Sequence, residues 1–254
     1  MQHSELPPAP PAVLALLLIL VLFNTVQAQQ PQQNNAGSPQ AGDRVFSSSI
    51  MSVNDLAAPK EARAELHLGL VDSDNRLWND GIKHFQKALE YYSKYDSAYY
   101  DLGIAYLQGN QLEQARETFT KALEVNPGNY LAELGMGILL TQEGQYAEAE
   151  IFLKKSLVFD PRNIGALAVL AFSQLQRGEH EAALATAQKV HRAGHHLFCF
   201  SHLVAAEALI NLHRENEAAA EYRTFLNEEP NNPHAEEARN FLANRTSISV
   251  RGAN

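Results

Sequence analysis

Small and large apolar residues recur along most of the chain at a fixed interval of 34 residues. Gly69, Gly103 and Gly137 are spaced in this way, and each follows an apolar residue. Several columns with one shared period indicate a structural repeat of that length. Three further columns keep the period: Gly81, Ala115, Ala149 and Ala183; Phe85, Phe119, Leu153 and Ala187; and Pro127 and Pro161.

Each repeat is predicted to be a pair of antiparallel helices. We expect a small residue of the first helix to face a small residue of the second, so that the two backbones approach closely. The prolines mark the turn between pairs, because proline cannot continue a helix. Within three pairs, Gly109-Asn110, Glu143-Gly144 and Arg177-Gly178 offer the residue with positive φ that a tight turn requires.

The repeat boundaries follow from these columns. One inserted residue near Phe198 restores the phase up to Pro230. The array is expected over 54–244, with an amphipathic capping helix at 233–244 and a frayed tail at 245–254. Five pairs are predicted, at approximately 62–95, 96–129, 130–163, 164–198 and 199–232.

Two stretches, beginning at Tyr99 (YYDLGIAYLQGNQLEQARETFTKALEVNPGN) and at Leu134, resemble the tetratricopeptide-repeat family almost column by column. The resemblance covers roughly residues 62–232, although the aromatic that usually opens each unit is kept only at Tyr99. It implies an all-α fold, a right-handed superhelical solenoid of about five helix pairs with a C-terminal capping helix. It is specific for the fold and says little about the individual partner.

The N-terminal region differs from the repeats. Residues 12–23 (AVLALLLILVLF) are uncharged and apolar, and they are too few to span a bilayer comfortably. They match the core of a secretory signal peptide over 1–28, cleaved after Ala28, although the preceding residues contain no Lys or Arg. A polar linker follows at 29–53. We therefore expect an exported protein, periplasmic or extracellular, with a membrane anchor over 12–26 as the alternative.

Composition narrows the function classes. The net charge is −9 and no long basic run occurs, so the pattern of a nucleic-acid-binding protein is missing. A single cysteine, Cys199, excludes an internal disulfide or a zinc site of several thiolates. No P-loop, nucleophile elbow or dinucleotide-binding glycine pattern occurs. We predict a binding protein that is not an enzyme, with no cofactor and no membrane contact beyond an uncleaved signal segment.

The resemblance places a binding groove on the first helix of each pair. The matching positions are mostly uncharged, and they lack the combination of Lys and Asn with which some family members hold acidic tails. We therefore expect a protein or peptide partner that inserts as a helix or as an extended segment with apolar anchors. The predicted groove residues are Leu66, Leu70, Tyr100, Ile104, Leu107, Gln108, Leu134, Ile138, Thr141, Gln142, Ala168, Phe172, Leu175, Gln176, Leu203, Glu207 and Asn211.

Two other functions remain open. The repeats could associate with one another, end to end or through the groove. The chain could also bind a metal through a group of histidines, but these form no HExxH pattern, and no metal site is predicted. That group comprises His191, His195, His196, His202 and His213, with Cys199 among them.

Overall fold

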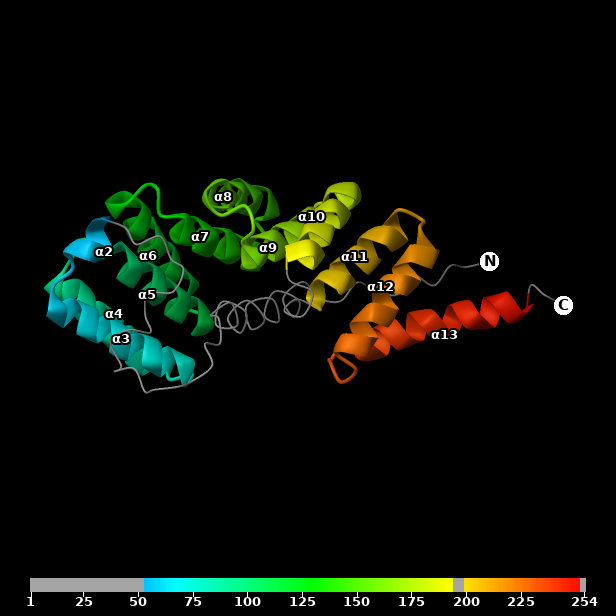
Figure 1. Ribbon diagram of the computed structural model, residues 1–254, viewed down its shortest axis with the longest axis horizontal. Coiled ribbons are helices and arrows are strands. Elements are labelled where there is room, and N and C mark those ends of the chain that lie inside the picture. The colour runs from blue at the N-terminus through cyan, green and yellow to red at the C-terminus, as the bar shows by residue number, and fades with distance from the viewer. Residues whose placement is uncertain (1–52, 194–198, 252–254) are drawn as a thin grey trace, which may run out of the picture. The chain divides into compact units, whose positions relative to one another are not determined.

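The computed structural model describes residues 53–193 and 199–251 (Figure 1). The predicted signal segment and nearly all of the predicted linker lie outside these residues. Twelve helices and no strand occur in the described part, so the prediction of an all-α fold is confirmed. The helices are α2 (Val53–Ala57), α3 (Lys60–Asp74), α4 (Trp78–Tyr91), α5 (Asp96–Gln108), α6 (Leu112–Val125), α7 (Tyr130–Gln142), α8 (Tyr146–Phe159), α9 (Ile164–Gln176), α10 (His180–Ala193), α11 (Phe200–Asn211), α12 (Glu215–Glu228) and α13 (Ala235–Arg251).

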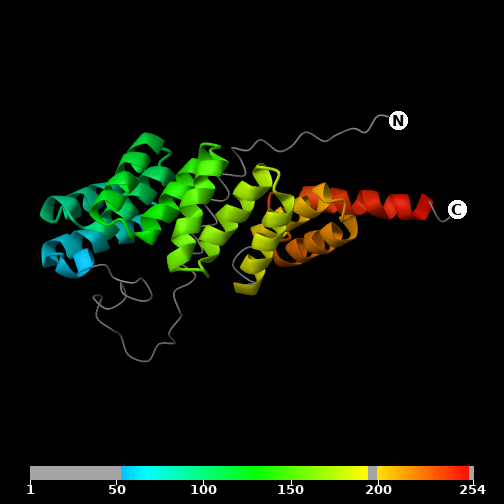
Figure 2. The ribbon, with the colours of Figure 1, turned by 90° about the horizontal axis from the view of Figure 1, so that it is seen from above.

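The helices of the described residues form two compact units, 53–160 and 161–251. In the first unit, α3 pairs with α4, α5 with α6 and α7 with α8, while α2 packs on α5. In the second unit, α9 pairs with α10 and α11 with α12, and α13 packs on α12 as the predicted cap. Figures 1 and 2 show the paired helices in two views. The five predicted pairs are therefore all present.

The glycine columns lie where a large side chain crosses the partner helix. A Cβ atom on Gly69 or Gly103 would lie 2.5 Å from the ring of Phe85 or Phe119, respectively. On Gly137 it would lie 2.6 Å from the side chain of Leu153. The expectation that small residues face only small residues was therefore incomplete, because each first-helix glycine mainly accommodates the large residue of its own pair.

In each unit, the first helices of successive pairs pack together more closely than the second helices do. The first helices contact one another, α3 with α5 and α5 with α7 in one unit, and α9 with α11 in the other. The second helices of successive pairs do not pack together to a comparable extent within the described residues. We call the first helices α3, α5 and α7, and separately α9 and α11, the inner layer of their units.

All five turns within pairs contain a residue in the left-handed region. Gly144 and Gly178 have φ of +77° and +75°, and Asn110 has +55°, at the turns predicted from the sequence. Arg76 and His213 take the same role, with φ of +61° and +58°. The sequence prediction missed these two because neither turn contains glycine.

Asparagine side chains cap two first helices. The side chain of Asn129 accepts a hydrogen bond from the Ala132 backbone at 2.9 Å, and Asn163 does the same for Ala166 at 2.9 Å. Such caps satisfy backbone N–H groups that have no partner inside the helix. In the first unit, buried Asp96 also accepts from Asn126 at 2.6 Å, which ties α5 to the next turn.

The C-terminal helix is longer than predicted. The cap was expected to end at residue 244, whereas α13 continues to Arg251, so residues 245–251 are helical. Arg245 bonds to Glu215 and, at 2.6 Å, to Asn216 at the start of α12, which extends the contact between the two helices. None of the helices in the described ranges has the length and apolar character needed to span a membrane.

Candidate partner-binding surface

The inner layer of the first unit carries ten of the predicted groove residues. Five of them are half-buried and retain some accessible surface: Leu70, Tyr100, Ile104, Gln108 and Gln142. The other five are buried: Leu66, Leu107, Leu134, Ile138 and Thr141. The accessible row is therefore narrower than the sequence predicted, because half of the predicted contacts serve packing inside the unit.

Two residues of the accessible row, Gln108 and Gln142, carry polar but uncharged side-chain amides. Gln142 Nε2 donates to Asn110 Oδ1 at 3.3 Å, which links the end of α7 to the turn after α5. Buried Thr141 donates to the Gly137 carbonyl oxygen at 2.8 Å, so its hydroxyl is satisfied within α7. Beside Tyr100, burial raises the pKa of half-buried Asp101, and the charge of Asp55 raises it further. The five side chains of the accessible row are themselves of uncharged types.

In the second unit the inner helix α9 is buried on all sides, as α7 of the first unit is from Ala132 to Thr141. Every residue of α9 from Ile164 to Leu175 is buried, as expected for a helix that is apolar all round. Phe172 packs its ring against Phe200 of α11, with centroids 6.1 Å apart. Ala168, Phe172 and Leu175, all predicted to line the groove, are therefore core residues in this structure.

The remaining predicted residues of this unit are accessible. Gln176 and Leu203 are half-buried, while Glu207 and Asn211 are exposed. Asn211 Nδ2 donates to the Glu207 carbonyl oxygen at 2.9 Å, within one turn of α11.

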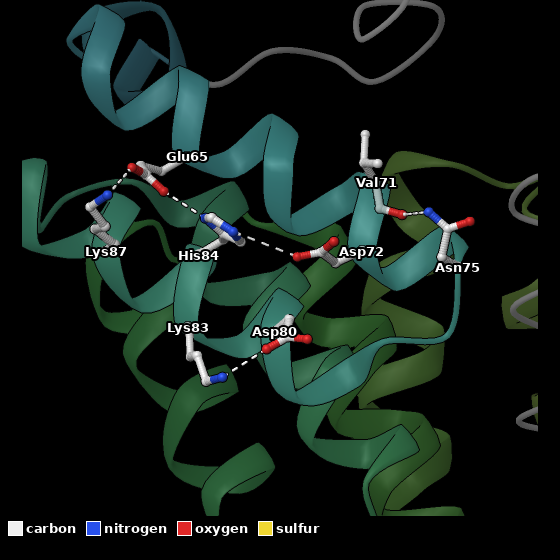
Figure 3. Close-up of polar contacts among 8 residues, drawn as sticks. All are labelled: Glu65, Val71, Asp72, Asn75, Asp80, Lys83, His84 and Lys87. Carbon is white, nitrogen blue, oxygen red and sulfur yellow. Dashed lines mark hydrogen bonds and ion pairs between the residues drawn. The ribbon is translucent and has the colours of Figure 1, made fainter.

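A polar cluster that the sequence analysis did not identify joins α3 and α4 (Figure 3). His84 Nδ1 lies 2.7 Å from Glu65 Oε2, and Lys87 pairs with the other oxygen of Glu65. On its far side, His84 Nε2 lies 3.6 Å from Asp72 Oδ2. The hydrogen bond from Lys87, and then that from His84, lowers the pKa of Glu65. The cluster therefore links α3 to α4 in the first helix pair.

The histidine group separates into different positions. His191 and His202 lie together, with ring centroids 4.0 Å apart and planes inclined by 26°. His213 is exposed in the turn before α12, while His195 and His196 fall outside the described residues. Burial raises the pKa of the Cys199 thiol to about 11, which makes it a poor thiolate donor at neutral pH.

Repeated helix pairs with a closely packed inner layer define a helical-repeat scaffold. Two models of the tetratricopeptide repeat match the chain, one over residues 60–127 and one over residues 100–164. Over residues 60–164 the chain is therefore a tetratricopeptide-repeat protein. Members of this family are typically non-catalytic scaffolds for interactions between proteins.

Solved structures of other repeat proteins share the fold. MamA (residues 41 to the end) from Desulfovibrio magneticus RS-1 is 15% identical, with 69% of this chain and 99% of that chain covered and a TM-score of 0.60. Pseudomonas aeruginosa pilF is 20% identical, with 73% of this chain and 88% of that chain covered and a TM-score of 0.64. YrrB, described as a TPR protein with an unusual peptide-binding site, is 19% identical, with 74% of this chain and 98% of that chain covered and a TM-score of 0.57. No curated protein sequence matches the chain.

Proposed function

We propose that the chain is an exported scaffold that binds a protein or peptide segment on the inner layer of its first unit. The observation that supports this most directly is the half-buried row of Tyr100, Ile104, Gln108 and Gln142 across α5 and α7. These side chains combine apolar surface with amide groups, which suits an inserted helix or an extended segment with apolar anchors. YrrB, which has the same fold, carries a peptide-binding site according to its description.

Site-specific crosslinking tests the binding surface. A photoreactive amino acid at Gln108 is expected to crosslink a discrete partner in the native compartment. The same group at exposed Lys121, on the second helix α6, serves as the matched control. Ile104→Glu should abolish the Gln108 crosslink without altering the melting temperature by more than a few degrees. Equal crosslinking from both positions, or crosslinking that survives Ile104→Glu, would contradict the proposal.

Export rests on the apolar segment at residues 12–23 and the polar stretch that follows it. Fractionation of cells that express the full chain tests it, together with N-terminal sequencing of the mature protein. We expect a new N-terminus at Gln29 in the exported fraction. Intact Met1 on membrane-bound protein would instead support the anchor over 12–26, and intact Met1 in the cytosolic fraction would exclude both readings.

Self-association is a second candidate, favoured by exposed apolar side chains at the N-terminal end of the first unit. Leu68 and Val71 on α3 are 46% and 42% exposed, and Leu56 on α2 is 66% exposed. Apolar surface of this kind often marks a contact with another protein. Light scattering over a range of concentrations tests the candidate, because Leu68→Glu should then shift the mass towards the monomer.

A further inference from the structure

We propose that His191, His202 and Glu221 form a zinc-binding site that joins α10, α11 and α12 in the second unit. One ring nitrogen of each histidine and one carboxylate oxygen of Glu221 all lie within 4.8 Å of one another. Within residues 53–193 and 199–251, no other three such side chains come as close together. The site is separate from the proposed partner-binding surface, which lies in the first unit.

The donor set favours a transition-metal dication such as zinc. Two imidazoles and one carboxylate are a common three-residue set for zinc, with the fourth position left to water or another ligand. Calcium and magnesium prefer oxygen donors throughout, so the two nitrogens disfavour them. His202 is 3% exposed, and this burial keeps competing water away from the donors.

The geometry requires only side-chain adjustments. Donor atoms about 2.1 Å from a tetrahedral zinc ion lie about 3.4 Å apart. His202 Nδ1 and Glu221 Oε2, at 2.6 Å, would separate slightly, and the widest pair, within 4.8 Å, would close. The two rings stack with their centroids 4.0 Å apart and their planes inclined by 26°, so both side chains must rotate for one nitrogen of each ring to point at a shared ion.

Glu228 supports the same arrangement. Its Oε2 lies 3.6 Å from His202 Nε2, on the opposite side of the ring from Glu221. When Nδ1 binds a metal, Nε2 keeps its proton and faces this carboxylate. A carboxylate behind a metal-bound histidine fixes the orientation of the ring and increases its basicity. Together, Glu221 and Glu228 also compensate for the charge of the dication.

The site lies at an irregular junction of the array. Ala171 and Ala206 occupy equivalent positions in the fourth and fifth pairs but are 35 residues apart, and no proline marks the turn between them. An ion held by His191 of one pair and by His202 and Glu221 of the next would fix the two pairs together there. At this junction, which lacks a proline, a bound ion would therefore connect the fourth and fifth pairs.

The chain contains a matched control for this site. Glu65 and His84 are also 19 residues apart and also form an acid–imidazole contact, at 2.7 Å. Their third neighbour is Lys87, which donates to Glu65 and whose positive charge would repel a metal ion. Substitution at His84 therefore removes a similar contact without touching the proposed zinc donors.

Titration of the untagged, chelator-treated full chain with zinc chloride tests the proposal. Calorimetry should show that one zinc ion binds tightly per chain, and zinc should raise the melting temperature. This tight binding should be lost in His191→Ala and His202→Ala, weakened in Glu221→Gln, and kept in His84→Ala and His213→Ala. Co²⁺ should give the intense visible absorption of a tetrahedral site in the wild type and not in His191→Ala.

Two results would overturn the proposal. One is the absence of tight zinc binding in the wild type, and the other is its persistence in His191→Ala. Half-buried His191 is the deciding position if His202→Ala does not fold, because its replacement disturbs the core less. Circular dichroism of each variant identifies any loss of helix that would reduce binding for another reason.

Discussion

Glu65 and His84 form a contact of 2.7 Å between the two helices of the first pair. The fifth pair contains the same contact with the residue types exchanged, since His202 on the first helix meets Glu221 on the second at 2.6 Å. Both contacts join positions 19 residues apart. The first position of the repeat is aromatic at Tyr99. It is occupied by Glu65 in the first repeat and by His202 in the fifth, and each of these forms one acid–imidazole contact.

The first prediction concerns the pH dependence of the Glu65 contribution. Hydrogen bonds from Lys87 and His84 lower the pKa of Glu65 from 4.5, so the folded protein holds its proton less tightly than the unfolded chain. The ionised carboxylate therefore stabilises the fold above pH 4.5, and this contribution is lost as the pH falls through the lower, folded-state pKa. Urea unfolding at a series of pH values should show that Glu65→Gln is less stable than the wild type near neutrality, and that the gap narrows in acid.

A matched variant separates this effect from a general loss of surface charge. Glu117 pairs only with Lys121 in the described contacts, and its side chain is 67% exposed. Glu117→Gln should change the unfolding free energy less than Glu65→Gln at neutral pH, because exposed pairs contribute little. A gap for Glu65→Gln that stays constant from neutral to acid pH would contradict the assigned role.

The second prediction tests the packing of the glycine columns. A Cβ on Gly103 would lie 2.5 Å from the buried ring of Phe119, so Gly103→Leu must displace the ring or separate α5 from α6. Overpacking of this kind costs roughly 1–3 kcal/mol. Gly137→Leu should behave similarly against Leu153. Thermal unfolding measures the effect, and an unchanged melting curve would contradict the assignment of these helices to pairs.

Gly128→Ala is the control for that experiment. Gly128 lies in the turn between α6 and α7, and an added Cβ would lie 3.5 Å from Asn126 Oδ1, an ordinary contact distance. Its replacement should leave the melting temperature nearly unchanged. Gly135 adds a position that the columns did not reveal, because its Cβ would lie 2.3 Å from Phe119 of the preceding pair.

The repeat could be predicted because its determinants are local and periodic. Gly69, Gly103 and Gly137 show the close helix approach, and Gly144 and Gly178 show the tight turns, each within a single residue column. The turns at Arg76 and His213 carry no such residue, so only the backbone shows that they adopt the same conformation.

The accessible surface was harder to predict, because burial depends on contacts between distant parts of the chain. Phe172 and Ile104 occupy equivalent sequence positions, yet Phe172 is buried against Phe200 while Ile104 stays half-exposed. The acid–imidazole pairs were missed for a related reason. The acid is Glu65 on the first helix of one pair but Glu221 on the second helix of the other. Neither repeat position therefore keeps one residue type that a comparison of the repeats could detect.

The third prediction concerns the cap of α7. Asn129 accepts from the Ala132 backbone at 2.9 Å, and its side chain also approaches buried Asp96. Asn129→Ala should destabilise the protein by roughly 0.5–2 kcal/mol, the usual cost of removing a cap. Asn129→Ser keeps a cap acceptor and should recover part of the loss. Equal unfolding free energies for the Ala and Ser variants would show that the cap bond is not the cause.

The fourth prediction concerns the extended part of α13. Arg245 contacts Glu215 and Asn216, and its side chain is 28% exposed. Arg245→Ala should cost roughly 0.2–1 kcal/mol, as expected for an ion pair that remains partly accessible to solvent. It should also speed hydrogen exchange at residues 245–251. Exposed Arg223 on α12 provides the control, and faster exchange in Arg223→Ala as well would assign the effect to charge alone.

The fifth prediction isolates the cost of the left-handed turn residues. Arg76 has φ of +61°, a conformation that costs a residue with a side chain roughly 1–2 kcal/mol. Arg76→Gly should therefore raise the melting temperature, although the greater freedom of glycine in the unfolded chain offsets roughly 0.5–1 kcal/mol. Gly144→Ala should lower it, since Gly144 has φ of +77° and no atom lies within 4 Å of an added Cβ. The opposite signs cannot arise from packing, because the Gly144 site is sterically open. Shifts of the same sign in both variants would mean that contacts, and not backbone conformation, determine the stability of these turns.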